Sequence, residues 1–158
     1  LSVSMTSRAK RDYEEDGRAY FFVTKDCFEN KIASGDLLEY TCYNGNYYGT
    51  LRSEVSKHLN NGESVILEIE IEGALNIKKL VPEAIFIFIL PPDMQTLLSR
   101  LKSRGTEDDN KIISRFRTAY KEINEITKYN YVVVNDSLEE AVNKWEIACW
   151  SNWRYRSW

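Results

Sequence analysis

The twelve-residue stretch EYTCYNGNYYGT, which begins at Glu39, carries side chains that could bind a polar, planar ligand. It holds a carboxylate at Glu39, a phenol at Tyr48 and a hydroxyl at Thr50. Its aromatic residues favour extended chain, and Asn44-Gly45 is the kind of dipeptide that turns a β-hairpin. Because side chains alternate along a strand, Tyr48 and Thr50 share one face. We therefore predict a hairpin that brings the three groups to one pocket, although an ordinary amphipathic hairpin with surface tyrosines fits the same residues.

Hydrogen-bond donors that could hold an anion gather near the start of the chain. Ser4, Arg8, Lys10 and Arg11 lie within eight residues of one another. Arginine presents a forked pair of donors whose geometry suits phosphate. The segment predicts an anion site, and a solvated basic loop is the competing interpretation.

A second group of arginines surrounds a turn in the stretch LLSRLKSRGTEDDNKIISRFR, residues 97–117. The turn begins at Gly105, and Arg104 and Arg115 lie on its two sides. Arginines that converge over a phosphoryl group neutralise the charge that develops as it is transferred. We predict that Arg104 and Arg115 do this, while a solvated helix pair laced with ion pairs is the alternative.

Two acidic residues interrupt the apolar run SVILEIEI, residues 64–71. As a strand, this run would place Glu68 and Glu70 on one face near its carboxyl end, which is where open parallel sheets bind ligands. Two carboxylates there could hold Mg²⁺, which prefers oxygen ligands and often keeps water. Pairing with an arginine, or a place at an exposed edge, would explain the same two residues.

The elements that must position these groups alternate along the chain after residue 60. Runs rich in β-branched and apolar residues predict strands at 64–71, 84–90 and 131–134. Helical patterns cover 73–80, 92–103 and 107–128, and a last helix follows the caps Asp136 and Ser137. Alternation of this kind predicts a parallel α/β core with right-handed crossovers. The run 84–90 is apolar throughout, which suits a strand covered on both faces.

The first 60 residues are expected to form a small mixed α/β element. The residues 18–23 read as a strand, and a short helix begins near Thr24 and ends at Gly35. The range 51–61 reads as a second helix. The inward stripe of that helix is Leu51, Val55 and Leu59.

Composition narrows the classes of protein to which the chain can belong. Its 158 residues suit one domain, and 43% hydrophobic with 28% charged content suits a packed core. The net charge of −3 provides no general basic field, so we expect no nucleic-acid partner. The three cysteines lack metal-site spacing, and no apolar run approaches a membrane span. A reducing, cytoplasmic setting and no membrane partner are expected, with monomer and homodimer both open.

Several short motifs together resemble the guanylate kinase family. They occur in the family's order over residues 1 to about 142: SVSMTSR at 2–8, DGRAYFFV at 16–23, GNYYGT at 45–50, ILEIE at 66–70 with Gly73, RLKSRG at 100–105 and VVND at 133–136. The resemblance implies transfer of the γ-phosphoryl group of ATP, with Mg²⁺, onto GMP. It also implies a P-loop-kinase-like parallel sheet flanked by helices. The implied parts are a mixed GMP-binding subdomain at 1–60, a core at 61–96 and 119–158, and a helical lid at 97–118.

The resemblance also assigns roles to the candidate residues. Ser4, Glu39 and Thr50 would meet the guanine base. The GMP phosphate would be held by Arg8, Arg11, Tyr20 and Tyr48. Glu68 would also belong to the residues that bind GMP. Arg104 and Arg115 would be the catalytic lid arginines, with Arg104 also contacting ATP. Asn135 would lie near the adenine of ATP, and Glu68 and Glu70 would hold Mg²⁺ through water.

The chemistry of the base supports the assignment of Glu39. Guanine presents N1–H and N2–H₂ as parallel donors that a carboxylate can accept together, and Thr50 can donate to O6. Adenine offers neither pattern and would leave Glu39 desolvated and unpaired. A site built in this way can reject the wrong base by roughly 10⁴ or more.

The chain departs from the family pattern in three respects. It contains no G-x-x-x-x-G-K-[ST] loop to cradle the ATP phosphates, and it begins abruptly at Leu1. We expect that loop to precede Leu1 in the gene product, and we expect these 158 residues alone to bind GMP without turnover. Glu68 and Glu70 replace usual aspartates, and the Trp-rich tail 150–158 matches nothing expected.

Two other functions compete with the kinase. Domains of the membrane-associated guanylate kinase type share the expected fold but bind phosphorylated peptides without catalysis. A degenerate fragment that binds GMP without turnover is a further alternative. Arg104 and Arg115 favour the enzyme, because a peptide-binding domain has no use for lid arginines.

Overall fold

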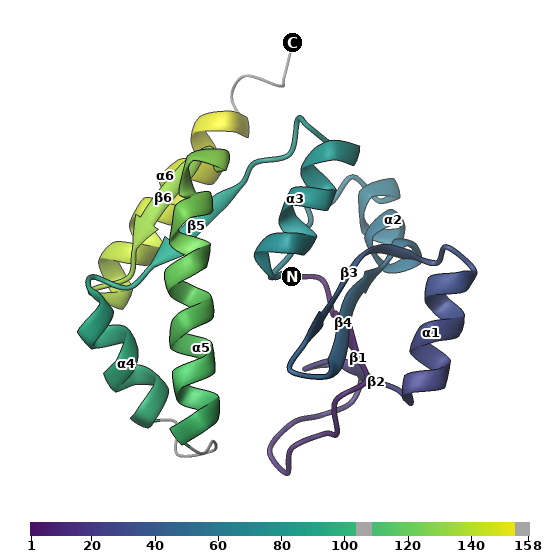
Figure 1. Cartoon of the computed structure of the whole chain (residues 1–158). Helices are drawn as coiled ribbons and strands as arrows, with labels where there is room; N and C mark the ends of the chain where they lie inside the picture. The colour runs from purple at the N-terminus through teal and green to yellow at the C-terminus, as the bar shows by residue number, and fades with distance from the viewer. Residues whose placement is uncertain (104–108, 154–158) are drawn as a thin grey trace. The chain divides into compact units, whose positions relative to one another are not determined.

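The computed structural model describes residues 1–103 and 109–153, and the side chains of 151–153 lie outside the description. The chain divides into two compact units, an N-terminal unit, Leu1–Pro82, and a C-terminal unit, Glu83–Trp158. Figure 1 shows the helices and strands of the two units along the chain.

A four-stranded sheet organises the N-terminal unit. Its order is β2-β1-β4-β3, and the strands are β1 Met5–Thr6, β2 Phe21–Phe22, β3 Leu37–Tyr43 and β4 Asn46–Leu51. β1 is parallel to β2, whereas β4 is antiparallel to both β1 and β3. The turn between β3 and β4 has φ of 50° at Asn44 and 77° at Gly45. Positive φ at both positions is typical of a two-residue I′ turn, so the predicted hairpin is confirmed.

Two short helices flank this sheet. α1 Lys25–Ala33 begins after Thr24, whose side chain accepts from the Cys27 N–H. Its predicted start and its end before Gly35 are both confirmed. α2 Arg52–Asn60 is also found where it was predicted, and it buries Val55. Leu59 does not belong to the inward stripe, because 56% of it is exposed.

The hydrophobic core of the N-terminal unit lies between α1 and the sheet. Phe28 is fully buried and clusters with Met5 and Leu37. The Tyr47 ring stacks on Phe28, with centroids 5.2 Å apart and planes inclined by 16°. This packing anchors β4 to α1.

The predicted strand at 64–71 is not formed. Residues 64–70 have no regular secondary structure, and α3 Ile71–Leu80 begins at the end of the predicted strand. The Ile66 carbonyl accepts from the Ser2 N–H at 2.9 Å. Exposure alternates along the segment, with Ile66, Glu68 and Glu70 exposed and the residues between them half-buried. The sequence pattern therefore describes the two faces correctly, but a strand also needs a partner backbone that pairs along its length.

The C-terminal unit contains a two-stranded parallel sheet, β5 Ile87–Leu90 and β6 Tyr131–Val134. This pair confirms two of the three predicted parallel strands, although β5 begins three residues later than expected. The expectation that the 84–90 strand is covered on both faces is wrong for the described chain. Ile89 is 58% exposed, and on β6 Val132 and Val134 are 44% and 39% exposed. An apolar run predicts burial, but which neighbours cover it depends on tertiary packing.

Helices make up the rest of this unit. They are α4 Met94–Ser103, α5 Asp109–Glu122, the 3₁₀ helix η1 Ile123–Lys128 and α6 Leu138–Trp153. They match the predicted helical ranges, except that the last six residues of 107–128 tighten into a 3₁₀ turn. Among the described residues, no helix is both long and apolar enough to cross a membrane.

Candidate active site

Glu39 and Thr50 form a buried pair near the end of the β3–β4 hairpin that lies away from its turn. They are Cα partners in the strand register, and the Thr50 hydroxyl donates to Glu39 Oε1 at 2.7 Å. Glu39 is 5% exposed and Thr50 is fully buried. Burial raises the pKa of Glu39, the Thr50 hydrogen bond opposes that rise, and the charge of Glu70 adds to it. The single hydroxyl proton of Thr50 is therefore committed to Glu39.

Arg8 and Arg11 are held together by an acid that the sequence analysis did not select. Arg8 donates from Nη1 and Nη2 to the two carboxylate oxygens of Glu14, at 3.0 and 2.7 Å. The backbone N–H of Arg11 donates to Glu14 Oε2 at 2.7 Å. This pairing lowers the pKa of Glu14 and raises that of Arg8. The R-x-x-R-x-x-E spacing was the signal that could have identified Glu14.

Aromatic rings connect Arg8 to the hairpin. The Arg8 guanidinium lies 5.6 Å from the ring centres of both Tyr20 and Phe22. The Tyr20 ring meets Tyr48 edge-to-face, with centroids 6.1 Å apart. Burial and then the charge of Glu68 raise the pKa of the Tyr20 phenol. The structure thus brings Arg8, Tyr20 and Tyr48 together, and the charge of Glu68 acts on the Tyr20 phenol.

Ser4 lies beside the same sheet. It is half-buried, and its carbonyl accepts from the Phe21 N–H at 2.9 Å, next to the β1–β2 pairing. Ser4 thus directly precedes β1, as Tyr20 directly precedes β2.

Glu68 and Glu70 offer a chemically suitable but sparse donor set for a cation. Both carboxylates are exposed on one side of the segment that leads into α3. Two carboxylates suit Mg²⁺, which usually keeps several water ligands. Among the described residues, there is no cluster of three or more acidic, histidine or cysteine side chains that could enclose a metal ion. The residues fit a largely hydrated Mg²⁺ and do not form a closed metal cage.

Asn135 contributes to a pocket in the C-terminal unit. The pocket has a volume of about 300 Å³ and is lined by Ile89, Leu90, Pro91, Leu97, Arg100, Leu101 and Asn135. Arg100 donates to the carbonyl oxygens of Asn135 and Asp136, at 2.8 and 3.4 Å. The arginine thereby ties α4 to the turn that follows β6. Arg100 belongs to the group of arginines that the sequence analysis found in residues 97–117, but no such role was assigned to it.

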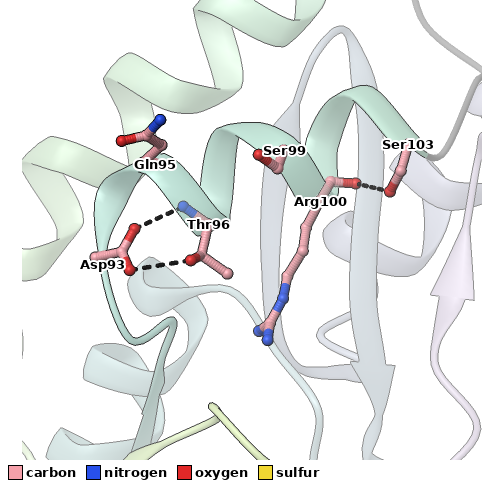
Figure 2. Close-up of a pocket in the computed structure, with 6 residues that line it drawn as sticks. All are labelled: Asp93, Gln95, Thr96, Ser99, Arg100 and Ser103. Atoms are coloured by element: carbon pink, nitrogen blue, oxygen red, sulfur yellow. Dashed lines mark hydrogen bonds between the residues drawn. The ribbon is translucent and has the colours of Figure 1, made fainter.

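The outer face of α4 borders a more open pocket of about 450 Å³ (Figure 2). Asp93 caps this helix by accepting from the Thr96 N–H at 2.7 Å and from the Thr96 hydroxyl at 3.0 Å. Ser103 donates to the Arg100 carbonyl at 3.0 Å. Asp93, Thr96 and Ser103 are thus bonded within the helix, whereas the Arg100 guanidinium is bonded to the carbonyls that follow β6.

Of the two predicted lid arginines, the structure describes only Arg115. Arg115 lies on α5 and is half-buried, with its Nε atom shielded from solvent. Arg104 lies outside the described residues.

Comparison with known proteins identifies the family. A family model described as guanylate kinase matches residues 1–152. This chain belongs to the guanylate kinase family. Guanylate kinases are nucleoside monophosphate kinases, so the enzyme class predicted from the sequence is confirmed.

Individual relatives agree with this assignment. The chain is 50% identical to a guanylate kinase of Clostridium acetobutylicum, over 91% of this chain and 69% of that protein. It is 52% identical to one of Clostridium tetani, with the same two coverages. A crystal structure of guanylate kinase from Anaplasma phagocytophilum matches with a TM-score of 0.80 at 31% identity. That match covers 96% of this chain and 74% of the other, and it confirms a mixed α/β guanylate kinase fold.

Proposed function

We propose that the N-terminal unit of this chain binds GMP and that the chain acts in transfer of the γ-phosphoryl group from ATP to GMP, giving ADP and GDP. The observation that carries the proposal is the Glu39 carboxylate. It is 5% exposed, and in the described chain it forms no ion pair. Burying a carboxylate without a cation is costly, and such groups cluster at functional sites.

Guanine supplies the donors that this carboxylate lacks. The N1–H and N2–H₂ groups point in parallel and match the two oxygens of a carboxylate. Thr50 acts on the base through Glu39, because its only hydroxyl proton already holds Oε1. Donation from Thr50 to O6 would require that hydroxyl to turn away from Glu39. Ser4, half-buried beside β1, completes the proposed base-binding group.

The phosphate of GMP is assigned to Arg8, Arg11, Tyr20 and Tyr48. The support is their grouping around Glu14, which holds both arginines before a ligand arrives. The rings of Tyr20 and Tyr48 lie next to the Arg8 guanidinium and bring phenol donors to the same place. Preorganised donors bind an anion without the entropic cost of ordering the side chains.

The ATP side is assigned to the C-terminal unit. The pocket beside Asn135 has apolar walls and an amide, which suits the flat and partly polar adenine ring. Arg115, with Arg104, is assigned to the transferring phosphoryl group, where cations stabilise developing charge. Glu68 and Glu70 would hold Mg²⁺ through water, and Glu68 is also assigned to GMP binding. When bound with ATP, that ion neutralises phosphate charge.

We also propose a functional division of the chain. The GMP-binding subdomain covers 1–60, the core covers 61–96 and 119–158, and the lid covers 97–118. A P-loop-kinase-like sheet underlies the core in this proposal. The parallel pairing of β5 with β6 supports it, since parallel strands joined by helices are the basis of that fold.

Calorimetric titration of the 158-residue chain with GMP and AMP tests the proposed function. We expect GMP to bind at least about 100-fold more tightly than AMP, because adenine leaves Glu39 unpaired. Glu39→Gln should remove most of that preference. Glu29→Gln, which alters an exposed carboxylate on α1, serves as the matched control and should leave it intact. Equal affinity for GMP and AMP, or an unchanged preference in Glu39→Gln, would refute the assignment.

A further inference from the structure

Gly73 lies where helix α3 passes closest to the Glu39 carboxylate. It is buried and is the third residue of the helix, which packs against β3. A Cβ atom built on Gly73 would overlap Glu39 Oε2 and would stand only 3.0 Å from Cδ and 3.6 Å from Cγ. No other residue supplies one of the three nearest atoms, so the space that a side chain would fill is occupied by this carboxylate.

Backbone conformation does not explain the glycine. Among the described residues, the glycines with positive φ are Gly17, Gly35, Gly45 and Gly62, and Gly73 is not one of them. Glycine inside a helix is also less favourable than alanine. The close approach of Glu39 is therefore the feature that requires the missing side chain.

The two oxygens of Glu39 are positioned by different neighbours. Thr50 donates to Oε1 at 2.7 Å, and the bare backbone of Gly73 leaves room for Oε2. The Oε2 side also faces the first turn of α3, where the helix dipole favours an anion. Two residues further along β3, Thr41 donates to Glu72 at 3.2 Å, which fixes α3 against β3. The carboxylate is thus held between a strand partner and a helix.

We propose that Gly73 is a positioning residue for base selectivity. Because it has no side chain, it leaves the space that the Glu39 carboxylate occupies. This inference rests on the proposed function, because it assumes that Glu39 accepts the purine donors. A methyl group at position 73 meets the far end of a flexible side chain. The methyl group should therefore displace the carboxylate more readily than the helix. As a result, it should weaken binding of the purine base more than it lowers folding stability.

The test measures dissociation constants of GMP and IMP for the 158-residue chain by calorimetry. IMP lacks the 2-amino group, so the ratio of the two constants reports the contact between that group and the carboxylate. Gly73→Ala should weaken GMP binding about 10-fold or more and move the GMP-to-IMP ratio towards one. Its thermal midpoint should stay the same or rise, since alanine is the better helix former. Asn76→Ala, at a half-buried position on the same helix, should change neither the GMP dissociation constant nor the GMP-to-IMP ratio.

A double variant separates a positioning role from a structural one. Glu39→Asp shortens the side chain by one methylene and withdraws the carboxylate from position 73. In that background, adding Gly73→Ala should change the GMP constant by less than about twofold, which is strong non-additivity between residues in contact. Additive losses, or unfolding of both the single and the double variant, would overturn the proposal and make Gly73 a structural residue.

The outcomes also distinguish this proposal from the proposed function. If Glu39→Gln abolishes the preference for GMP over IMP while Gly73→Ala leaves it unchanged, the inference about Gly73 fails and the role of Glu39 stands. If neither substitution alters the preference, the proposed role of Glu39 fails as well.

Discussion

The Glu14 carboxylate accepts two hydrogen bonds from the Arg8 guanidinium, at 3.0 Å from Nη1 and 2.7 Å from Nη2. The side chain of Glu14 is only 8% exposed and that of Arg8 is 17% exposed. Oε2 of Glu14 also accepts the backbone N–H of Arg11, so a single carboxylate orders both of the arginines assigned to the GMP phosphate. Paired and fork-shaped hydrogen bonds of this kind are the stronger ones in proteins.

Glu14→Ala is expected to damage both stability and phosphate binding. Losing a charge-assisted fork at a shielded site should lower the free energy of unfolding by about 1–3 kcal/mol. The affinity for GMP should fall more than the affinity for guanosine, because the arginines are no longer held in place. Denaturant unfolding and calorimetry with the two ligands measure these changes. Glu15→Ala is the control, since the Glu15 side chain is 71% exposed and pairs with Arg18 at the surface. Equal losses for guanosine and GMP would contradict the role of Glu14.

Acid should weaken the preference for GMP over IMP. Burial raises the pKa of Glu39, so this carboxyl becomes protonated at a higher pH than a free glutamate, which titrates near about 4.3. A protonated Glu39 cannot accept two donors from guanine. We expect the ratio of the two affinities to fall as the pH drops through the raised pKa. The phosphate titrates equally in both ligands and cancels from the ratio. Glu39→Gln should make the ratio independent of pH, and a flat wild-type profile would count against the assignment.

The opposite pKa shift at Glu14 affects folding stability. Pairing with Arg8 lowers the folded-state pKa of Glu14, so its stabilising contribution is present above the unfolded pKa. That contribution is lost as the pH falls through the lowered pKa. Thermal unfolding of the wild type should therefore lose stability below about pH 4, and Glu14→Gln should lose less over the same interval. Parallel curves for the two proteins would refute this expectation.

Arg115→Ala is expected to separate turnover from GMP binding. All groups assigned to GMP belong to the N-terminal unit, whereas Arg115 lies on α5 of the C-terminal unit. In a form of the protein that includes the loop for the ATP phosphates, we expect kcat for phosphoryl transfer to fall by about 10³ and the dissociation constant of GMP to stay within about twofold. A coupled assay and calorimetry check the two parts. Arg117→Ala removes an exposed arginine from the same helix and should leave both unchanged. A large loss of GMP affinity in Arg115→Ala would show that this arginine acts on the substrate ground state.

Arg100→Ala is expected to impair ATP binding. Arg100 donates to the carbonyls of Asn135 and Asp136 and so supports the turn that borders the pocket assigned to adenine. Removing it should weaken ATP binding by about 5- to 10-fold, the equivalent of roughly one hydrogen bond, without changing GMP affinity. Lys102→Ala, at an exposed position on the same helix, provides the comparison. Unaltered ATP affinity in Arg100→Ala would exclude this role.

The sequence by itself determined the features that depend on neighbours a few residues away. Asn44-Gly45 turns the hairpin because both positions adopt positive φ, and Thr24 starts α1 because its oxygen reaches the Cys27 N–H. Turn and cap chemistry of this kind is local, so it can be read from the order of the residues. The grouping of short motifs was also sufficient to indicate the family to which the chain belongs.

Only the tertiary structure decided which distant groups meet. The alternating pattern at 64–71 predicted a strand, but no local signal tells whether a partner backbone pairs with it. Likewise, the apolar character of Ile89 says nothing about what covers it. The approach of Gly73 to Glu39 joins positions that are 34 residues apart, and it depends on how α3 packs against β3. Long-range packing places the carboxylate, because its position is the outcome of contacts among a strand, a hairpin partner and a helix.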